Sequence, residues 1–117
     1  MKLSVIIPVY NELSTLEPAV RAVLAVNEAD EILVIDDGST DGTRDLYPAI
    51  EQLDPSIRVI LHEKNMGKGA AVRTGFAHAT GEIFLIQDAD LEYDPRDYRS
   101  MLRPCLLYTS PSPTRPY

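Results

Sequence analysis

The sequence has little cysteine, no long apolar run and few positive charges, and each of these shortages excludes a structural feature or a class of protein. Its single cysteine, Cys105, permits no internal disulfide, so a reducing compartment is expected. The chain opens on the apolar run at residues 3–7, without the basic region and longer apolar stretch of a signal peptide. No run approaches the ~20 apolar residues of a membrane span. We therefore expect a soluble, cytoplasmic chain.

Positive charges are scarce: 11 Lys and Arg residues stand against 18 Asp and Glu, which gives a net charge of −7. A general nucleic-acid-binding domain usually carries a basic patch, so this class is excluded. Anionic ligands are not excluded, because a metal ion or a few well-placed cations can hold them locally. The 117 residues, 44% of them hydrophobic, suit one modest domain with a real core, or a piece of a larger one.

What the sequence does contain is an alternation of short β-rich runs and helical patterns. The expected strands are residues 3–7, 32–35, 58–61 and 83–86. Between them, a capping-box pattern at residues 14–17 and apolar spacings of three and four residues indicate helices. Pro48 is expected to kink or shorten the second helix. This alternation predicts an α/β fold, a mostly parallel sheet flanked by helices.

Most of the unusual residues follow the expected strands. The carboxyl ends of these strands are residues 8–12, 36–42, 62–69 and 87–94. In open parallel sheets, ligands bind at this edge. We therefore expect these segments to build one binding site.

The segment DDGSTDG superficially resembles a calcium loop. Counted from Asp37, its twelfth position is Pro48 instead of Glu, and the segment follows a strand and not a helix, so an EF-hand is rejected. A tight turn with Ser39 or Asp41 as helix N-cap explains most of its residues. Such a turn does not need two carboxylates. Asp37 is therefore interpreted as a functional acid that accepts hydrogen bonds from a nucleobase or a ribose hydroxyl.

The segment NMGKGAAVRTG invites a phosphate-binding interpretation. It matches neither the dinucleotide-binding glycine pattern nor a Walker A loop. We expect Asn65 to cap a helix, while Gly67 and Gly69 expose backbone N–H groups. Lys68 and Arg73 add positive charge, and a helix start of this kind favours anions. The alternative is a plain capped helix with solvated cations.

The acidic stretch IQDADLEYDP, after the fourth expected strand, indicates a divalent cation site. Asp88 and Asp90 share one face of an extended segment, and two such carboxylates suit Mg²⁺ or Mn²⁺. Glu92 is a further candidate ligand, whereas the Asp-Pro pair that follows is expected in a turn. The two histidines, His62 and His78, have no spaced His or Cys partner and are interpreted as structural or solvated side chains.

Taken in order, SVIIPVYNE, VIDDGSTDGT, NMGKGAAVRTGF and GEIFLIQDADLEYDP resemble the motifs of family 2 glycosyltransferases, in particular the dolichyl- or polyprenyl-phosphate hexose synthases. The resemblance covers residues 2–98. It implies a glycosyltransferase A-type fold, truncated after the D-x-D motif, a nucleotide-diphosphate sugar donor with Mg²⁺ or Mn²⁺, and inversion of the anomeric centre. The expected nucleotide-sugar-binding residues are Pro8, Tyr10, Asn11, Glu12, Asp37, Lys68, Arg73, Gln87, Asp88 and Ala89. The expected metal ligands are Asp88, Asp90 and Glu92, although the family often has Gln at the last position.

The resemblance further implies transfer of a hexose from a GDP- or UDP-sugar to a polyprenyl or dolichyl phosphate. The alternatives are a family 2 transferase with a saccharide hydroxyl acceptor, and a nucleotide-binding fragment without activity. A lipid phosphate is already ionised, whereas a hydroxyl acceptor needs a general base, which would lie beyond this chain. Residues 1–104 are expected to be the donor-binding part, and residues 105–117 a non-native or disordered tail. Peripheral association with the cytoplasmic face of a membrane would depend on sequence beyond this chain.

Overall fold

A parallel sheet with helices on both faces forms the body of the protein. The structure, a computed structural model, describes residues 2–89 and 107–109. The strands are β1 Leu3–Val9, β2 Glu31–Asp36, β3 Ile57–Leu61, β4 Ile83–Ile86 and β5 Leu107–Thr109. The helices are α1 Leu16–Val26, the short 3₁₀ helix η1 Thr43–Leu46, α2 Tyr47–Glu51 and α3 Lys68–His78. Within the described residues, no helix has the length and apolar character needed to cross a membrane.

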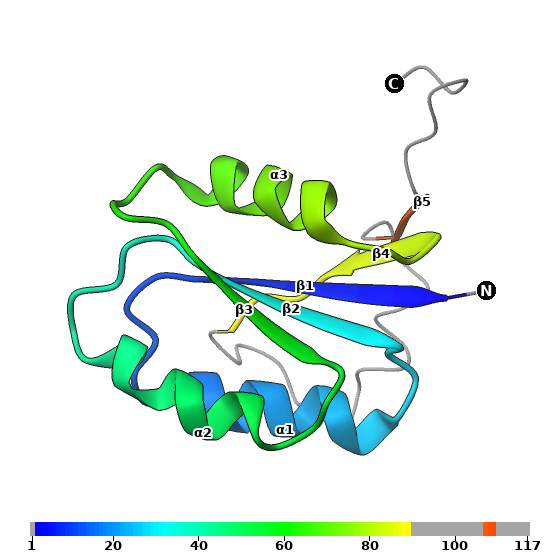
Figure 1. Ribbon diagram of the computed structural model, residues 1–117, viewed down its shortest axis with the longest axis horizontal. Helices are drawn as coiled ribbons and strands as arrows, with labels where there is room; N and C mark the ends of the chain where they lie inside the picture. The colour runs from blue at the N-terminus through cyan, green and yellow to red at the C-terminus, as the bar shows by residue number, and fades with distance from the viewer. Residues whose placement is uncertain (1, 90–106, 110–117) are drawn as a thin grey trace.

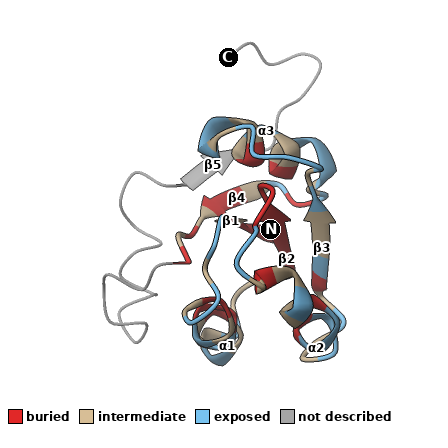
Figure 2. Cartoon of the chain, turned by 90° about the vertical axis from the view of Figure 1, so that its left-hand side faces the viewer, coloured by how far each residue is buried: buried red, intermediate tan, exposed pale blue. Residues whose placement is uncertain are grey.

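The order of the strands explains the layers. The sheet order is β3-β2-β1-β4-β5, in which the first four strands run parallel and β5 pairs antiparallel with β4. The chain steps outward from β1 to β3 and then returns across the sheet to β4. Because strand-helix-strand crossovers are right-handed, this reversal puts α1 and α2 on one face and α3 on the other, as Figures 1 and 2 show. The predicted α/β fold is confirmed.

Each face of the sheet has its own hydrophobic core. β2 is buried along its whole length, with alternate residues in the two cores, which explains its continuous apolar run. On the α3 face, Gly75 lies so close to β1 that a Cβ there would be 2.6 Å from Ile6 Cγ2. Phe76 of α3 stacks on Phe84 of β4 with 5.2 Å between ring centroids. α3 is therefore held tightly against the centre of the sheet.

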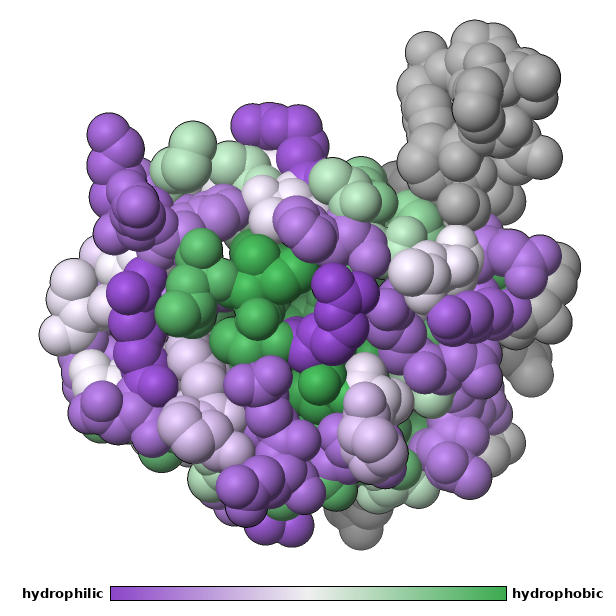
Figure 3. Space-filling view, viewed as in Figure 1, coloured by the Kyte–Doolittle hydropathy of each residue, from purple (hydrophilic) through white to green (hydrophobic). Residues whose placement is uncertain are grey.

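The outer strand β3 is less well covered. Leu61 keeps 52% of its accessible surface, and Arg58 is also exposed. Figure 3 shows hydrophobic atoms in the middle of this face, between α3 above and α2 below. Arg58 pairs with Glu31 of β2 at 3.3 Å. A charged side chain thus interrupts the exposed edge, which disfavours pairing with another strand.

β1 continues through Pro8 to Val9, two residues further than predicted. The carbonyl of Ile6 accepts from Gln87 N on the β4 side, and strand alternation turns residue 8 to that same side. β4 pairs with β1 only as far as Ile6, so the missing N–H of Pro8 removes no ladder hydrogen bond. The ladder between these two strands therefore stops where the pocket described below begins.

The start of α1 differs from the prediction. A capping box at residues 14–17 is wrong, because the N-cap of α1 is Thr15 and no side-chain cap hydrogen bond forms. The Thr15 hydroxyl donates instead to Glu12 Oε2 at 2.6 Å. The carbonyl of Glu12 accepts the N–H groups of Thr15 and Leu16. A loop residue, Glu12, thus satisfies the helix start, while Glu17 pairs with Arg21 at 2.9 Å.

The second helical region is short, as Pro48 predicts. This proline lies in the first turn of the five-residue helix α2, where a missing N–H costs little. The predicted N-cap at Ser39 or Asp41 is wrong, because Gly42 occupies that position before η1 with a left-handed φ of 100°. Asp41 lies one residue earlier, and its Oδ1 accepts the N–H of Thr43 at 3.0 Å. It therefore closes a local turn just before the helix.

The last strand lies inside the segment 105–117. The backbone of Leu107–Thr109 pairs with β4, with Leu85 opposite Leu107 and Ile83 opposite Thr109. Sequence patterns predict no strand there, and the expectation of a disordered tail stays a prediction. The interpretation of the segment as non-native stays a prediction.

Candidate functional site

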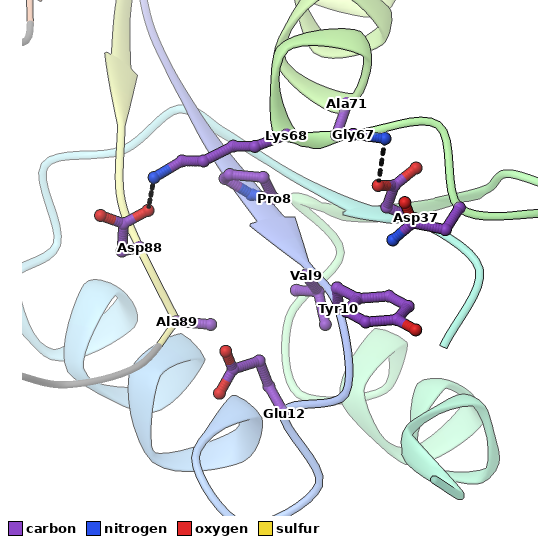
Figure 4. Close-up of a pocket in the computed structure, with 11 residues that line it drawn as sticks. Pro8, Val9, Tyr10, Glu12, Asp37, Gly67, Lys68, Ala71, Asp88 and Ala89 are labelled. Carbon is purple, nitrogen blue, oxygen red and sulfur yellow. Dashed lines mark hydrogen bonds and ion pairs between the residues drawn. The ribbon is translucent and has the colours of Figure 1, made fainter. Parts of the chain in front are cut away.

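A pocket of about 320 Å³ lies at the carboxyl ends of β1 and β4. These strands are neighbours in the sheet but distant in the chain, and the strand order reverses between them. Open α/β sheets bind ligands at such a reversal, so we call it the switch-point pocket. Its lining residues, most of them labelled in Figure 4, are Pro8, Val9, Tyr10, Glu12, Asp37, Asn65, Gly67, Lys68, Ala71, Asp88 and Ala89.

The structure brings seven of the ten predicted nucleotide-sugar residues to this pocket. The other three do not line it: Asn11 lies in the loop after β1, Arg73 is exposed on α3, and Gln87 is buried just after β4. Four residues that do line it are not among the ten predicted nucleotide-sugar residues, namely Val9, Asn65, Gly67 and Ala71, although the phosphate-binding interpretation included Asn65 and Gly67. The apolar members of this group carry no chemical signal, whereas Asn65 and Gly67 are marked by their place before a helix.

Asn11 shapes the pocket indirectly. Its backbone has a left-handed φ of 55°, which asparagine tolerates better than most residues. Asn11 Oδ1 accepts the N–H of Thr40 at 2.7 Å, and the N–H of Asn11 donates to Ser39 Oγ at 2.9 Å. These bonds tie the loop after β1 to the loop after β2.

Asp36, the last residue of β2, is entirely buried and belongs to the scaffold. Its Oδ2 accepts the N–H groups of Gly38 and Ser39, at 3.2 and 3.0 Å. Arg44 Nε donates to the same oxygen at 3.0 Å, and the Tyr47 hydroxyl donates to Oδ1 at 2.5 Å. Burial works to raise the pKa of this carboxyl, but the hydrogen bonds from Ser39, Tyr47 and Arg44 outweigh it and hold the pKa below its usual range. Burial, and then the bond to Asp36, raise the pKa of Tyr47.

Asp37, the next residue, lines the pocket although only 4% of its side chain is exposed. Its Oδ1 accepts the N–H of Met66 and its Oδ2 that of Gly67, both at 2.8 Å; the second bond is drawn in Figure 4. The neighbouring Gly38 is pressed against the same loop, since a Cβ there would lie 2.5 Å from Asn65 N. Asp37 thus locks the loop that leads into α3.

These contacts correct the phosphate-binding prediction for the start of α3. Asn65 does not cap the helix, because the N-cap is Gly67 and no side-chain cap hydrogen bond forms. The N–H of Gly67 is not open to an anion, since it donates to Asp37. The physical reason is that a helix start favours negative charge, and the carboxylate of Asp37 already supplies it. Of the two predicted cations, Lys68 is the one that lines the pocket, and its side chain is 61% exposed.

His62 lies directly after β3, and the structure confirms that it is structural. Its Nδ1 is 2.9 Å from Asp37 Oδ1, and its Nε2 is 2.8 Å from Thr74 Oγ1 of α3. Only 10% of its side chain is exposed. The sequence gives one signal for a link to the site, which is the position of His62 at a strand end.

Asp88 lies across the pocket from Asp37, as Figure 4 shows, and its side chain is 44% exposed. Lys68 Nζ donates to Asp88 Oδ1 at 2.5 Å. Exposed ion pairs contribute about 0–1 kcal/mol, so a ligand can displace this one. A partly exposed carboxylate fits a hard divalent cation such as Mg²⁺ or Mn²⁺.

The remaining metal-site predictions lie outside the described residues, since Asp90 and Glu92 are not among them. Within residues 2–89, no three His, Cys, Asp or Glu side chains form a group that could hold a metal ion. Gln87 is described, and its Nε2 donates to the carbonyl of Asp88 at 3.2 Å. Its Oε1 is buried and has no partner among the described residues. Gln87 thus supports the backbone of Asp88 and does not line the pocket.

The fold and the pocket define an α/β protein with a candidate ligand site at the reversal of its strand order. A family model described as glycosyl transferase family 2 matches residues 4–106. The chain belongs to this family. It is 42% identical over 101 residues to the undecaprenyl-phosphate 4-deoxy-4-formamido-L-arabinose transferase of Salmonella paratyphi A, which covers 82% of this chain. The chain spans 31% of the length of that relative.

Solved structures agree with this assignment. A mannosyltransferase from Pyrobaculum calidifontis, in complex with GDP-Man and Mn²⁺, is similar with a TM-score of 0.71 and 27% identity, over 87% of this chain and 38% of that one. Glucosyl-3-phosphoglycerate synthase from Mycobacterium tuberculosis, in complex with UDP, is similar with a TM-score of 0.69 and 29% identity, over 84% of this chain and 37% of that one. The predicted glycosyltransferase A-type fold is therefore confirmed.

Proposed function

We propose that this chain is the donor-binding part of a glycosyltransferase that moves a sugar from a nucleotide-diphosphate sugar to a polyprenyl phosphate, with inversion at the anomeric centre. The observation that carries the proposal is the switch-point pocket, with buried Asp37 on one side and Asp88 with Lys68 on the other. The donor class is supported by similar structures that hold GDP-Man with Mn²⁺ and UDP. The acceptor class is supported by the undecaprenyl phosphate in the name of the relatives. The transfer itself is proposed for the whole protein, of which this chain is a part.

The nucleoside would bind on the Asp37 side of the pocket. A carboxylate repels phosphate but accepts hydrogen bonds from the N–H groups of a base or from a ribose hydroxyl. Tyr10 also lines the pocket and keeps 45% of its surface exposed, so its ring is open to stack on a base. Pro8 and Ala71 add an apolar wall.

The diphosphate would bind on the opposite side, between Lys68 and Asp88. Lys68 would release Asp88 and pair with a phosphate, which leaves the carboxylate of Asp88 for a divalent cation. The residues that would hold Mg²⁺ or Mn²⁺ are Asp88 together with Asp90 and Glu92. When bound, such a cation neutralises charge that grows on the departing nucleoside diphosphate. Lys68 adds a second positive charge beside the same leaving group.

A polyprenyl phosphate acceptor would need no general base. A phosphate monoester carries about −1.5 to −2 charge at pH 7 and can attack without losing a proton first. The carboxylate of Asp37 already accepts three N–H groups, whereas, among the described residues, that of Glu12 accepts the Thr15 hydroxyl on Oε2 alone. The acceptor class is therefore supported by the relatives and not by the lack of a base in the pocket. The proposed setting is the cytoplasmic face of a membrane.

Calorimetry with UDP and GDP, each with and without Mn²⁺, tests the donor half. We expect one nucleotide to bind, with an affinity that rises when Mn²⁺ is present. Absence of heat with both nucleotides contradicts the proposal. The acceptor half needs the whole protein, in which radiolabelled sugar should move to undecaprenyl phosphate. Transfer to a saccharide hydroxyl alone would favour the polysaccharide-building alternative instead.

A further inference from the structure

Three side chains connect the switch-point pocket to the body of α3. Asp37 Oδ1 lies 2.9 Å from His62 Nδ1, and His62 Nε2 lies 2.8 Å from Thr74 Oγ1. Asp37 and His62 are both nearly buried, so these hydrogen bonds are shielded from water. Of the three residues, only Asp37 lines the pocket.

The two ring nitrogens of His62 have different roles. An ionised carboxylate only accepts hydrogen bonds, so Nδ1 carries the hydrogen and donates to Asp37. In the neutral ring Nε2 accepts, and the Thr74 hydroxyl donates to it. The backbone is held as well: His62 N donates to the carbonyl of Asp36 at 2.8 Å, and Arg44 donates to the carbonyl of His62. The ring therefore cannot turn without breaking a hydrogen bond.

Counting acceptors on Asp37 shows what is left for a ligand. Its two carboxylate oxygens offer about four lone-pair positions. Oδ1 accepts the Met66 N–H and the His62 ring, whereas Oδ2 accepts only the Gly67 N–H among the described residues. One position on Oδ2 is left, on a carboxylate whose other positions fix its orientation. The group that fits this position is an N–H or O–H donor.

We propose that His62 is a positioning residue for the nucleoside half of the donor. With Thr74 behind it, His62 holds Asp37 so that the last acceptor position on Oδ2 is presented to an N–H of the base or to a ribose hydroxyl. His62 itself touches no ligand. The inference rests on the proposed function, because it needs a nucleotide in the pocket. We expect its effect on the nucleoside half, since the ammonium of Lys68 lies beside Asp88 on the other side of the pocket.

Two substitutions separate the two nitrogens of His62. In His62→Asn, the amide nitrogen takes the place of Nδ1 and keeps a donor for Asp37. In His62→Gln, the amide reaches toward the place of Nε2, and Asp37 loses that donor. His78→Gln is the matched control, because His78 is exposed on α3 and outside the pocket. Calorimetry with Mn²⁺ measures the affinity for UDP and GDP, and for pyrophosphate, which lacks the nucleoside.

For the nucleotide that the unaltered chain binds, we expect His62→Gln to weaken affinity about tenfold. His62→Asn should restore most of it, His78→Gln should change nothing, and pyrophosphate affinity should stay constant throughout. Unchanged nucleotide affinity in His62→Gln overturns the positioning role and leaves the proposed function intact. An equal loss for pyrophosphate overturns it too. If the unaltered chain binds neither UDP nor GDP, the proposed function fails and the positioning role fails with it.

Thr74→Val provides a milder variant in case His62→Gln does not fold. It removes one hydroxyl and keeps the shape of the side chain. We expect it to weaken nucleotide affinity by about threefold, because the ring then loses one of its two fixing bonds. Pyrophosphate affinity should again be unchanged. If nucleotide affinity is also unchanged, the connection through Thr74 has no role in positioning.

Discussion

The carboxyl ends of β2 and β4 both carry acidic residues at the same edge of the sheet, but they hold those acids in opposite ways. Asp36 is fully buried, and backbone N–H groups, Arg44 and Tyr47 occupy its oxygens. Asp88 is half exposed, and Lys68 is its side-chain partner within the described residues. The position of an acid at a strand end therefore does not tell whether that acid belongs to the scaffold or to the site. The two kinds of acid differ in how many of their hydrogen-bond acceptor positions the protein itself fills.

Asp37 lies between these extremes. Three N–H groups fill most of its acceptor positions, and one position faces no donor among the described residues. A carboxylate whose acceptor positions are all occupied by protein donors stabilises the fold, and one with unoccupied positions is available to a ligand. A carboxylate with most positions occupied does both, because its protein partners fix the direction in which it accepts a further hydrogen bond. The three acids thus form a graded series from scaffold to site, which the following changes test.

Removal of Asp36 should have the largest effect. Asp36→Ala leaves two backbone N–H groups, the Tyr47 hydroxyl and the Arg44 guanidinium without their acceptor. We expect the free energy of unfolding, measured by urea denaturation, to fall by about 3–5 kcal/mol, as for other broken buried ion pairs. Asp45→Ala, an exposed acid in η1, should change it by less than about 0.5 kcal/mol. Equal effects of the two substitutions would show that Asp36 is not part of the scaffold.

Lowering the pH should reversibly remove the stability that the buried carboxylates contribute. Burial works to raise the pKa of Glu31, but hydrogen bonds from Thr80, Ser4 and Arg58 outweigh it, so its pKa is lowered, as is that of Asp36. Such a carboxyl stabilises the fold at pH values above its unfolded pKa of about 4, and the contribution is lost as the pH falls through the folded pKa. Urea denaturation should show level stability from pH 7 to about 5 and a decline below about pH 4. Asp36→Asn should show a shallower decline, and an identical decline would contradict the assignment.

The strands could be predicted because buried parallel strands need continuous apolar runs, and each run here is bounded by loop residues. The hydrogen bonds at the helix starts could not be predicted, because their partners come from irregular or distant segments. Thr15 bonds to Glu12 in the preceding loop, and the start of α3 bonds to Asp37, which is 30 residues earlier than Gly67. Capping patterns consider the N-cap and the residues that follow it, so they contain neither contact.

The sequence predicts Asp37 as the functional acid, but local patterns do not show why the adjacent Asp36 belongs to the scaffold. The two acids are adjacent in the sequence, and only one of them meets Tyr47 and Arg44. That meeting depends on the path of η1 and α2, which sequence patterns do not specify. The contact of His62 with Asp37 depends likewise on β3 lying next to β2.

Asp88→Asn should change binding and leave stability intact. The ion pair with Lys68 is exposed, so the free energy of unfolding should move by less than about 0.5 kcal/mol. The affinity for nucleotide in the presence of Mn²⁺ should fall about tenfold, because a neutral amide is a poorer ligand for a hard cation. Asp45→Asn is the control in the same calorimetric titration. A loss of stability as large as that of Asp36→Ala would place Asp88 in the scaffold.

The cationic partners of the two acids should give the most direct contrast. Arg44 donates to Asp36 and also to the carbonyl of His62, whereas Lys68 reaches only Asp88 in the part of the chain that the structure describes. Arg44→Gln should lower the free energy of unfolding by about 1–2 kcal/mol, and Lys68→Gln by less than about 0.5 kcal/mol. Without nucleotide, Lys68→Gln should raise Mn²⁺ affinity about twofold, because the ammonium no longer competes for Asp88. Electron paramagnetic resonance of free Mn²⁺ measures that affinity. If both glutamine variants lose the same stability and neither changes Mn²⁺ binding, the number of protein donors on each carboxylate does not decide which acid belongs to the scaffold and which to the site.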